Sequence, residues 1–247
     1  MASEYIARLD ATAEDLFYHA LAVLHAPLYR DENAGALRQD WPRVPLPEDR
    51  EVLLASAELG RQVALLLDTE REAPGVAARA GAVRPELRSI GPVTRVGGGS
   101  LGADDLSVTA GWGHGGNGRA VMPARGRAVE RAYTVEEREA MAEGAGALGL
   151  TPEDAARLLG AGTYDIYLND AAYWRNVPAR VWDYTIGGYQ VLKKWLSYRE
   201  RGVLGRALTP DEAREAPAMA RRIAAILLLG PRLDASYAAA KEATLTV

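Results

Sequence analysis

The stretch TIGGYQVLKKWL, residues 185–196, combines two adjacent glycines with residue types that bind phosphates and bases. It predicts a strand that turns through Gly188 into a helix, whose first backbone N–H groups favour an anion such as a phosphate. Tyr189 can donate a hydrogen bond to a phosphate or stack on a base, and Gln190 can pair with the edge of an adenine. The alternative is a simple packing turn, with Lys193 and Lys194 merely solvated.

Positive charge is concentrated in two windows of a chain that is acidic overall. The formal net charge is −4, which argues against general binding to polyanions but permits a local basic face. The basic residues are Arg119, Arg125, Arg127 and Arg131 in residues 112–131, and Lys193, Lys194, Arg199, Arg201 and Arg206 in residues 187–206. Each window holds a single acid, so each is either a binding surface or an ordinary solvated face.

The sequence contains no recognisable catalytic or metal-binding arrangement. It has no cysteine, and its histidines, His19, His25 and His114, lack the spacing that puts two ligands on one helical face. It also lacks the zincin, nucleophile-elbow, kinase and phosphate-loop motifs, and the tetrapeptide with which amino-methylating enzymes hold a flipped base. We therefore expect a noncatalytic binding module with no metal and no cofactor of its own.

Composition indicates an ordinary soluble globular protein. The 247 residues are 48% hydrophobic and 25% charged, and the absence of cysteine suits a reducing compartment. No apolar segment follows the N-terminus, and the longest apolar run, IAAILLLG, is shorter than the ~20 residues of a membrane-spanning helix. We expect a cytoplasmic protein that does not contact a membrane.

Changes in periodicity along the chain predict the α+β class. We expect an N-terminal helical segment over residues 1–70, a β-rich hairpin middle over residues 71–133, and a mixed strand–helix C-terminal part. Capping patterns mark four helix starts, at Thr12, Thr134, Thr151 and Thr209. Other expected elements are a helix at 28–41, a hairpin turn at 97–105, and strands at 164–169 and 181–186.

Four segments together resemble the C-terminal part of type ISP restriction–modification enzymes. They are FYHALAVLHAPLYRDENAGALRQDWPRVPLP, TAGWGHGGNGRAVMPARGRAVERAYT, VWDYTIGGYQVLKKWLSYRE and ARRIAAILLL, in the family's order and over almost the whole chain. Such enzymes combine nuclease, helicase and adenine-N6 methyltransferase regions with a target recognition domain. The resemblance implies a helical linker at residues 1–70 and a recognition domain at residues 71–247. It places S-adenosylmethionine, ATP and Mg²⁺ only on catalytic regions that this chain lacks.

Under this resemblance the partners are double-stranded DNA and a methyltransferase region or polypeptide. The expected DNA contacts are Trp112, His114, Asn117, Arg119, Arg125, Arg127, Gly188, Tyr189, Gln190, Lys193, Lys194 and Arg199. Arginine can read guanine, and Asn or Gln can read adenine, whereas Lys193, Lys194 and Arg199 are expected to touch phosphates. Core packing is an equal alternative for Trp112. A rival hypothesis is a protein-interaction module whose apolar helices dock on a methyltransferase without binding DNA.

Overall fold

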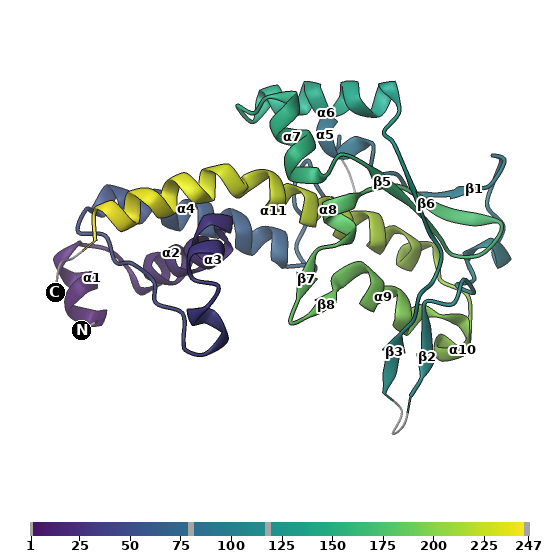
Figure 1. Ribbon diagram of the computed structural model, residues 1–247, viewed down its shortest axis with the longest axis horizontal. Coiled ribbons are helices and arrows are strands. Elements are labelled where there is room, and N and C mark those ends of the chain that lie inside the picture. Colours follow the sequence, from purple (N-terminus) through teal and green to yellow (C-terminus); the bar gives the residue numbers. More distant parts are fainter. Residues whose placement is uncertain (1, 79–81, 117–119, 245–247) are drawn as a thin grey trace. The chain divides into compact units, whose positions relative to one another are not determined.

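The computed structural model describes residues 2–78, 82–116 and 120–244 and forms two compact units (Figure 1). One unit joins residues 1–72 to residues 228–247, and the other comprises residues 73–227. Helices and antiparallel sheets occur in one chain, which confirms the predicted α+β class. The assignment of residues 1–70 as a linker and 71–247 as a recognition domain stays a prediction.

The first unit is helical. Its elements are α1 (Ala2–Arg8), α2 (Ala13–His25), α3 (Pro27–Glu32), the 3-10 turn η1 (Ala36–Arg38), α4 (Arg50–Leu67) and the C-terminal part of α11 (Pro210–Glu242). Its main core contains Val23, Tyr29, Val63, Leu233 and Tyr237, which come from α2, α3, α4 and α11. This unit therefore depends on both ends of the sequence.

Local sequence signals set the helix boundaries in this unit. The predicted capping box of Thr12 and Asp15 is confirmed at the start of α2. The helix predicted over residues 28–41 is correct only in its first part, because α3 ends at Glu32 and only a 3-10 turn follows. The side-chain amide of Asn33 donates to a carbonyl oxygen one turn earlier at 2.8 Å. Such bonds compete with helix continuation, so the break has a local cause.

His19 is fully buried and links α2 to two other segments. Its Nε2 lies 2.8 Å from the carbonyl oxygen of Pro45, which can only accept a hydrogen bond, so Nε2 carries the proton. Nδ1 then accepts from the hydroxyl of Ser56 at 2.8 Å. Burial lowers the pKa of His19 and favours the neutral ring. Both ring nitrogens serve the fold.

Helices α2 and α4 approach each other so closely at Gly60 that no side chain fits between them. A Cβ atom at this position would lie 1.8 Å from the carbonyl oxygen of Tyr18. The clash would be with main chain, which cannot rotate away as a side chain can. A Cβ atom at Gly35, in contrast, would meet nothing within 4 Å.

We predict that Gly60→Ala destabilises the protein by about 1–3 kcal/mol, because it forces α2 and α4 apart. Without a clash, alanine would stabilise a helix interior by about 1 kcal/mol relative to glycine. A decrease in the free energy of unfolding on Gly60→Ala would therefore identify the clash. Urea denaturation followed by circular dichroism measures the free energy of unfolding. Gly35→Ala is the control, and equal stability of the two variants would contradict the close approach.

The second unit is built on a four-stranded antiparallel sheet in the order β1–β6–β5–β4. The strands are β1 (Val93–Arg95), β4 (Ala128–Arg131), β5 (Thr163–Tyr167) and β6 (Ala172–Pro178). Strand β1 pairs with β6, with Val93 opposite Trp174, although the two strands are distant in sequence. The hairpin turn predicted at residues 97–105 is therefore wrong, because the strand before that segment pairs elsewhere.

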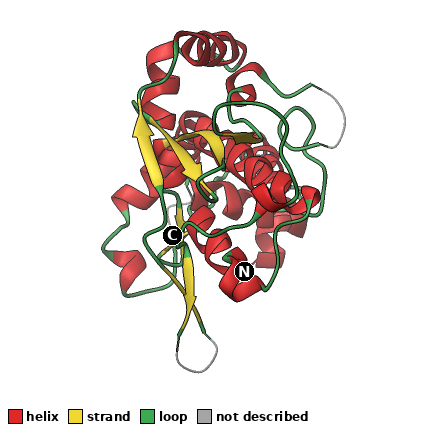
Figure 2. Ribbon diagram, turned by 90° about the vertical axis from the view of Figure 1, so that its right-hand side faces the viewer, coloured by secondary structure: helices red, strands yellow, loops and turns green. Residues whose placement is uncertain are grey.

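Two small hairpins and several helices complete this unit. The hairpins are β2 (Gly113–Gly115) with β3 (Val121–Pro123), and β7 (Thr185–Ile186) with β8 (Tyr189–Gln190). The helices are α5 (Pro85–Arg88), η2 (Asp104–Leu106), α6 (Val135–Ala147), α7 (Pro152–Leu159), α8 (Ala179–Trp182), α9 (Val191–Arg199), α10 (Arg201–Leu204) and the first part of α11. α6 and α9 lie on opposite sides of the sheet (Figure 1), and the β2–β3 hairpin extends away from the sheet (Figure 2).

The sequence located some of these elements and missed others. The capping boxes at Thr134 and Thr151 are confirmed, and the predicted bonds between Thr209 and Glu212 are present. The strand predicted at 164–169 corresponds to β5. The strand predicted at 181–186 is wrong over most of its length, because α8 occupies its beginning and β7 only its last two residues.

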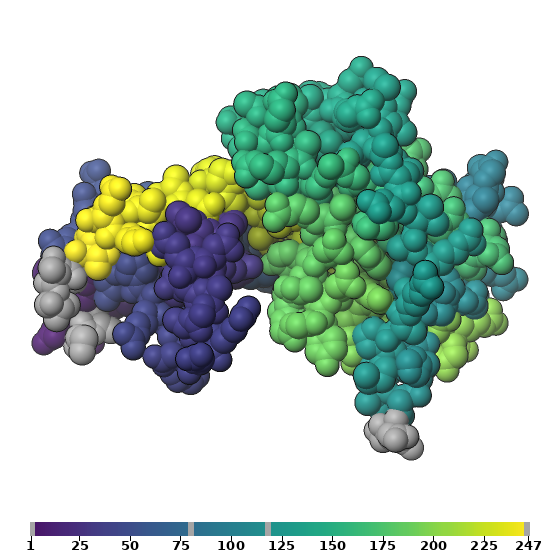
Figure 3. Space-filling model, in the orientation of Figure 1, coloured from purple at the N-terminus to yellow at the C-terminus, as the bar shows by residue number. Residues whose placement is uncertain are grey.

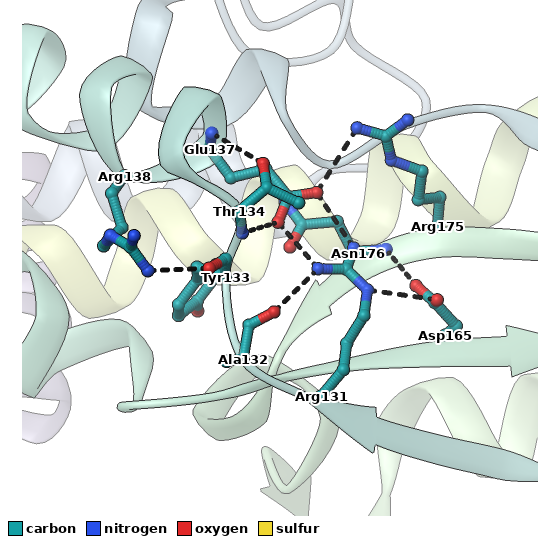
Figure 4. Close-up of polar contacts among 9 residues, drawn as sticks. All are labelled: Arg131, Ala132, Tyr133, Thr134, Glu137, Arg138, Asp165, Arg175 and Asn176. Atoms are coloured by element: carbon teal, nitrogen blue, oxygen red, sulfur yellow. Dashed lines mark hydrogen bonds and ion pairs between the residues drawn. The ribbon is translucent and has the colours of Figure 1, made fainter.

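A buried ion-pair network joins the sheet to α6 (Figure 4). Glu137, 2% exposed, accepts hydrogen bonds of 2.7 and 2.9 Å from Arg131, whose Nε also donates to Asp165 at 3.1 Å. Burial alone would raise the pKa of Glu137, but the bonds from Arg131 and from the N–H of Thr134, with the charges of Arg131 and Arg175, hold it below its ordinary value. One carboxylate thus begins α6 and ties it to β4.

We predict that this network makes stability fall in acid. The pKa of Glu137 is lower in the folded state than in the unfolded chain, where it is about 4.3. The contribution of Glu137 to the free energy of unfolding is therefore fully present above that unfolded pKa, and it is lost as the pH falls through the folded pKa. Glu137→Gln should weaken this acid dependence and should cost about 1–3 kcal/mol at neutral pH, because Arg131 loses the charge of one carboxylate partner and keeps only Asp165. Urea midpoints from pH 3 to 7 test this, with Glu139→Gln, an exposed change on α6, as the control. Parallel pH profiles for Glu137→Gln and the unmodified protein would contradict it.

Helix α11 spans 33 residues, and one of its windows is long and apolar enough to cross a membrane by length and composition. Of that window, 56% is buried within the fold. Core helices of water-soluble proteins pass the same test, so the expectation that the chain avoids membranes stays a prediction.

Candidate nucleic-acid interface

The glycine pair at residues 187 and 188 forms the turn of a β-hairpin. Ile186 lies opposite Tyr189, and Gly187 and Gly188 have φ values of 57° and 82°. Positive φ at both central residues defines the type I′ turn, which matches the twist of a two-residue hairpin and favours glycine. The predicted direct turn from strand to helix is wrong, because β8 separates the glycines from α9.

Polar contacts of the fold occupy the start of α9. The side-chain nitrogen of Gln190 donates to the carboxylate of Asp183 at 3.1 Å, and the N–H of Val191 donates to the carbonyl oxygen of Tyr184 at 3.0 Å. A carboxylate beside a helix start competes with any other anion there. We therefore give this helix start no role in binding a phosphate. The amide of Gln190 is held toward Asp183.

The β2–β3 hairpin docks on α9 through a backbone contact. A Cβ atom at Gly113 would lie 2.2 Å from the carbonyl oxygen of Ser197, so only glycine permits this approach. Within the hairpin, His114 lies opposite Met122. In the space-filling view this hairpin projects beyond the neighbouring surface of residues 185–199 (Figure 3).

Lys194 of α9 connects the two hairpins. Its Nζ donates to the carbonyl oxygen of Val121 in β3 at 3.1 Å. The same Nζ lies 4.9 Å from the ring centroid of Tyr189 in β8 and 4.8 Å from that of Tyr198. Aromatic faces attract such a cation, so Lys194 fixes both hairpins to one helix.

We name the surface of residues 113–115, 121–125 and 185–199 the twin-hairpin face. The predicted contact residues in these segments are His114, Arg125, Gly188, Tyr189, Gln190, Lys193, Lys194 and Arg199. His114 and Arg125 are exposed and Lys193 is half-buried. Asn117 and Arg119 lie outside the described residues.

Trp112 lies in the core, which is the alternative that the sequence left open. Its ring is fully buried, its Nε1 donates to the carbonyl oxygen of Tyr167 at 2.7 Å, and it meets the ring of Trp182 edge to face. A Cβ atom at Gly126 would lie 2.0 Å from the indole, which shows how tightly the ring is enclosed. The structure therefore does not present Trp112 to a base.

Arg127 and Arg199 are compensated within the fold. Arg127 pairs with Asp170 at 2.9 Å, and Arg199 pairs with Glu215 at 2.9 Å. Each guanidinium also lies over an aromatic ring, 4.0 and 3.8 Å from its centroid. An arginine that already faces a carboxylate contributes less attraction to a phosphate, so both are weaker candidates than Arg125.

Three exposed apolar side chains of the twin-hairpin face were not predicted as contacts. Ile186 is 57% exposed, Met122 48% and Tyr198 47%. A Gly-Gly pair between short alternating runs is a hairpin signal, and reading it so would have placed Ile186 beside the turn.

The buried acidic side chains are engaged by arginines. Glu86 is 2% exposed and pairs with Arg84 at 2.7 Å, and Glu137 belongs to the network around Arg131. Within the part of the chain that the structure describes, no group of three or more His, Cys, Asp or Glu side chains is arranged to hold a metal ion.

We predict that Gly113→Ala displaces the β2–β3 hairpin from α9 and lowers stability by about 1–3 kcal/mol, because its Cβ would overlap the main chain of Ser197. Gly115→Ala is a matched control in the same strand, since a Cβ atom there would meet nothing within 4 Å. Thermal unfolding followed by circular dichroism separates the two. A Gly113→Ala variant as stable as Gly115→Ala would show that the hairpin does not dock as described.

Comparison with known proteins gives one family. The sequence model described as the type ISP C-terminal specificity domain matches residues 3–223 of the 247. No curated protein and no solved structure matches the chain. The matched segment contains both hairpins, α9 and the four-stranded sheet. The chain belongs to the family of type ISP C-terminal specificity domains.

Proposed function

We propose that this specificity domain recognises double-stranded DNA through the twin-hairpin face. Its family supports target recognition in a restriction–modification system. The observation that carries the DNA proposal is Lys194, which contacts a hairpin on each side of it. Two-stranded ribbons can enter a groove of duplex DNA, and a cation at their base lies where phosphates would approach.

The cations of the face suit phosphate contacts. An ammonium has three N–H donors, and the hydrogen bond to β3 uses one from Lys194. Arg125 and Lys193 form no ion pair with any residue that the structure describes. The segments that define the face contain no acidic residue, and Asp183, which accepts from Gln190, lies outside them. The face therefore offers positive charge on a chain of net charge −4.

The hairpins supply groups that could read bases. His114 and Tyr189 are exposed on different hairpins, and both can stack on a base or form a hydrogen bond with it. Asn117 and Arg119 follow β2 in the sequence and remain proposed contacts for adenine and guanine. Gln190 and Arg199 become secondary, because each already has a partner in the fold.

In this proposal catalysis belongs to other regions. The chain is noncatalytic, acts in the cytoplasm without a membrane, and works with a methyltransferase region or polypeptide. S-adenosylmethionine, ATP and Mg²⁺ would bind those other regions. The family description, which names a specificity domain, supports this division of labour.

A salt titration of duplex binding tests the proposal. Affinity should fall as salt rises, because each phosphate contact releases counterions and contributes about −0.9 to the slope of log K against log salt. Arg125→Gln combined with Lys193→Gln should therefore make the slope shallower by about 2 and weaken binding to all sequences. Fluorescence anisotropy with random-sequence duplexes measures both quantities.

The control for this titration is Arg88→Gln, which removes an exposed cation from α5, outside the twin-hairpin face. It should leave the slope unchanged. Absence of duplex binding at low salt, or an equal effect of Arg88→Gln, would refute the proposal.

The rival function, docking on a methyltransferase without DNA contact, has its own support in the first unit. Trp41 is 86% exposed and Phe17 is 62% exposed, and aromatic side chains are enriched at protein interfaces. Capture of a purified methyltransferase polypeptide, together with no affinity for duplex DNA, would favour this function.

A further inference from the structure

The β7–β8 hairpin carries an exposed apolar pair directly behind a turn without side chains. Ile186 and Tyr189 are opposite each other in the ladder, so their side chains share one face of the ribbon. They are 57% and 54% exposed. The turn consists of Gly187 and Gly188, and a Cβ atom at either would meet nothing within 4 Å. The hairpin therefore has a tip without side chains, followed by the apolar side chains of Ile186 and Tyr189.

We infer that Ile186 and Tyr189 form a wedge that enters DNA from the minor groove and separates two neighbouring base pairs. This inference rests on the proposed DNA binding and adds its mode. Glycines at the tip let main chain approach the DNA closely, and proteins that insert apolar wedges do so from the minor groove. Apolar side chains inserted there unstack a base step and bend the duplex toward the major groove.

The surroundings of the pair favour DNA over a protein or a lipid surface. The Nζ of Lys194 lies 4.9 Å from the ring centroid of Tyr189, so a cation lies beside the apolar pair. Lys193 is the next basic residue on α9. An apolar pair beside a cation matches a base stack beside a phosphate, whereas an apolar protein pocket would have to bury the charge of Lys194.

On the opposite face of the same ribbon, Gln190 contacts the fold and Thr185 is exposed. Thr185 and Gln190 form the other pair of the ladder, and the Gln190 amide donates to Asp183 and to the carbonyl oxygen of Trp182. These contacts hold the base of the hairpin while the pair of Ile186 and Tyr189 remains outside. A wedge needs such a fixed base, because the hairpin must keep its position while its side chains separate two stacked base pairs.

The test uses the full chain and short duplexes with 2-aminopurine, whose fluorescence rises on unstacking, placed at a TA step or within an A-tract. TA steps unstack easily and A-tracts are stiff, so the protein should raise the fluorescence of the first duplex more. Ile186→Ser with Tyr189→Ser should abolish the rise and weaken binding about tenfold, while the salt slope stays unchanged. Tyr189→Phe should retain the rise, because stacking does not need the hydroxyl.

Val135→Ser is the matched control, because Val135 is 56% exposed on α6, outside the twin-hairpin face. Salt-dependent binding without any rise in fluorescence, or a rise that survives the double substitution, would overturn the wedge and leave the proposed DNA binding intact. No binding at low salt would overturn both. Equal melting temperatures of all variants would show that the fold is preserved.

Discussion

The contact between β2 and α9 is the constraint on which the twin-hairpin face depends. Main chain meets main chain at Gly113 and Ser197, and any side chain at Gly113 would separate them. Helix α9 is itself fixed, because Leu192 and Leu196 are buried in the second unit. Lys194, on the same helix, then holds β3 by a hydrogen bond and Tyr189 by its ring. Two ribbons from distant parts of the sequence thereby share one rigid support.

Elements defined by short-range chemistry could be predicted from the sequence, and elements defined by long-range pairing could not. The capping boxes at Thr12, Thr134 and Thr151 each involve residues three apart, so a short sequence pattern contains both partners of their hydrogen bonds. Strand β6, in contrast, is held between β1 and β5, and its irregular register and the positive φ of Asn176 hide the alternation that identifies a strand.

The same distinction explains the candidate site. The sequence identified Lys193, Lys194 and Arg125 as cations, because the charge of a side chain follows from its residue type. It could not show that Arg199 faces Glu215 or that Trp112 is enclosed, because these partners come from separate segments. Compensation of charge is a tertiary property, and a basic window in a sequence overstates the charge that remains available.

The long helix α11 has a consequence for how specificity could be exchanged between relatives. The second unit is an internal segment, residues 73–227, and the first unit resumes at residue 228 within the same helix. A transplanted unit therefore needs two junctions, and the second falls inside a continuous helix. Inserting or deleting one residue there would change the helical phase between the buried residues before the junction, such as Ile223, and those after it, such as Leu233, by about 100°. A junction that keeps the number of residues in α11 therefore preserves this phase for the buried residues of both units.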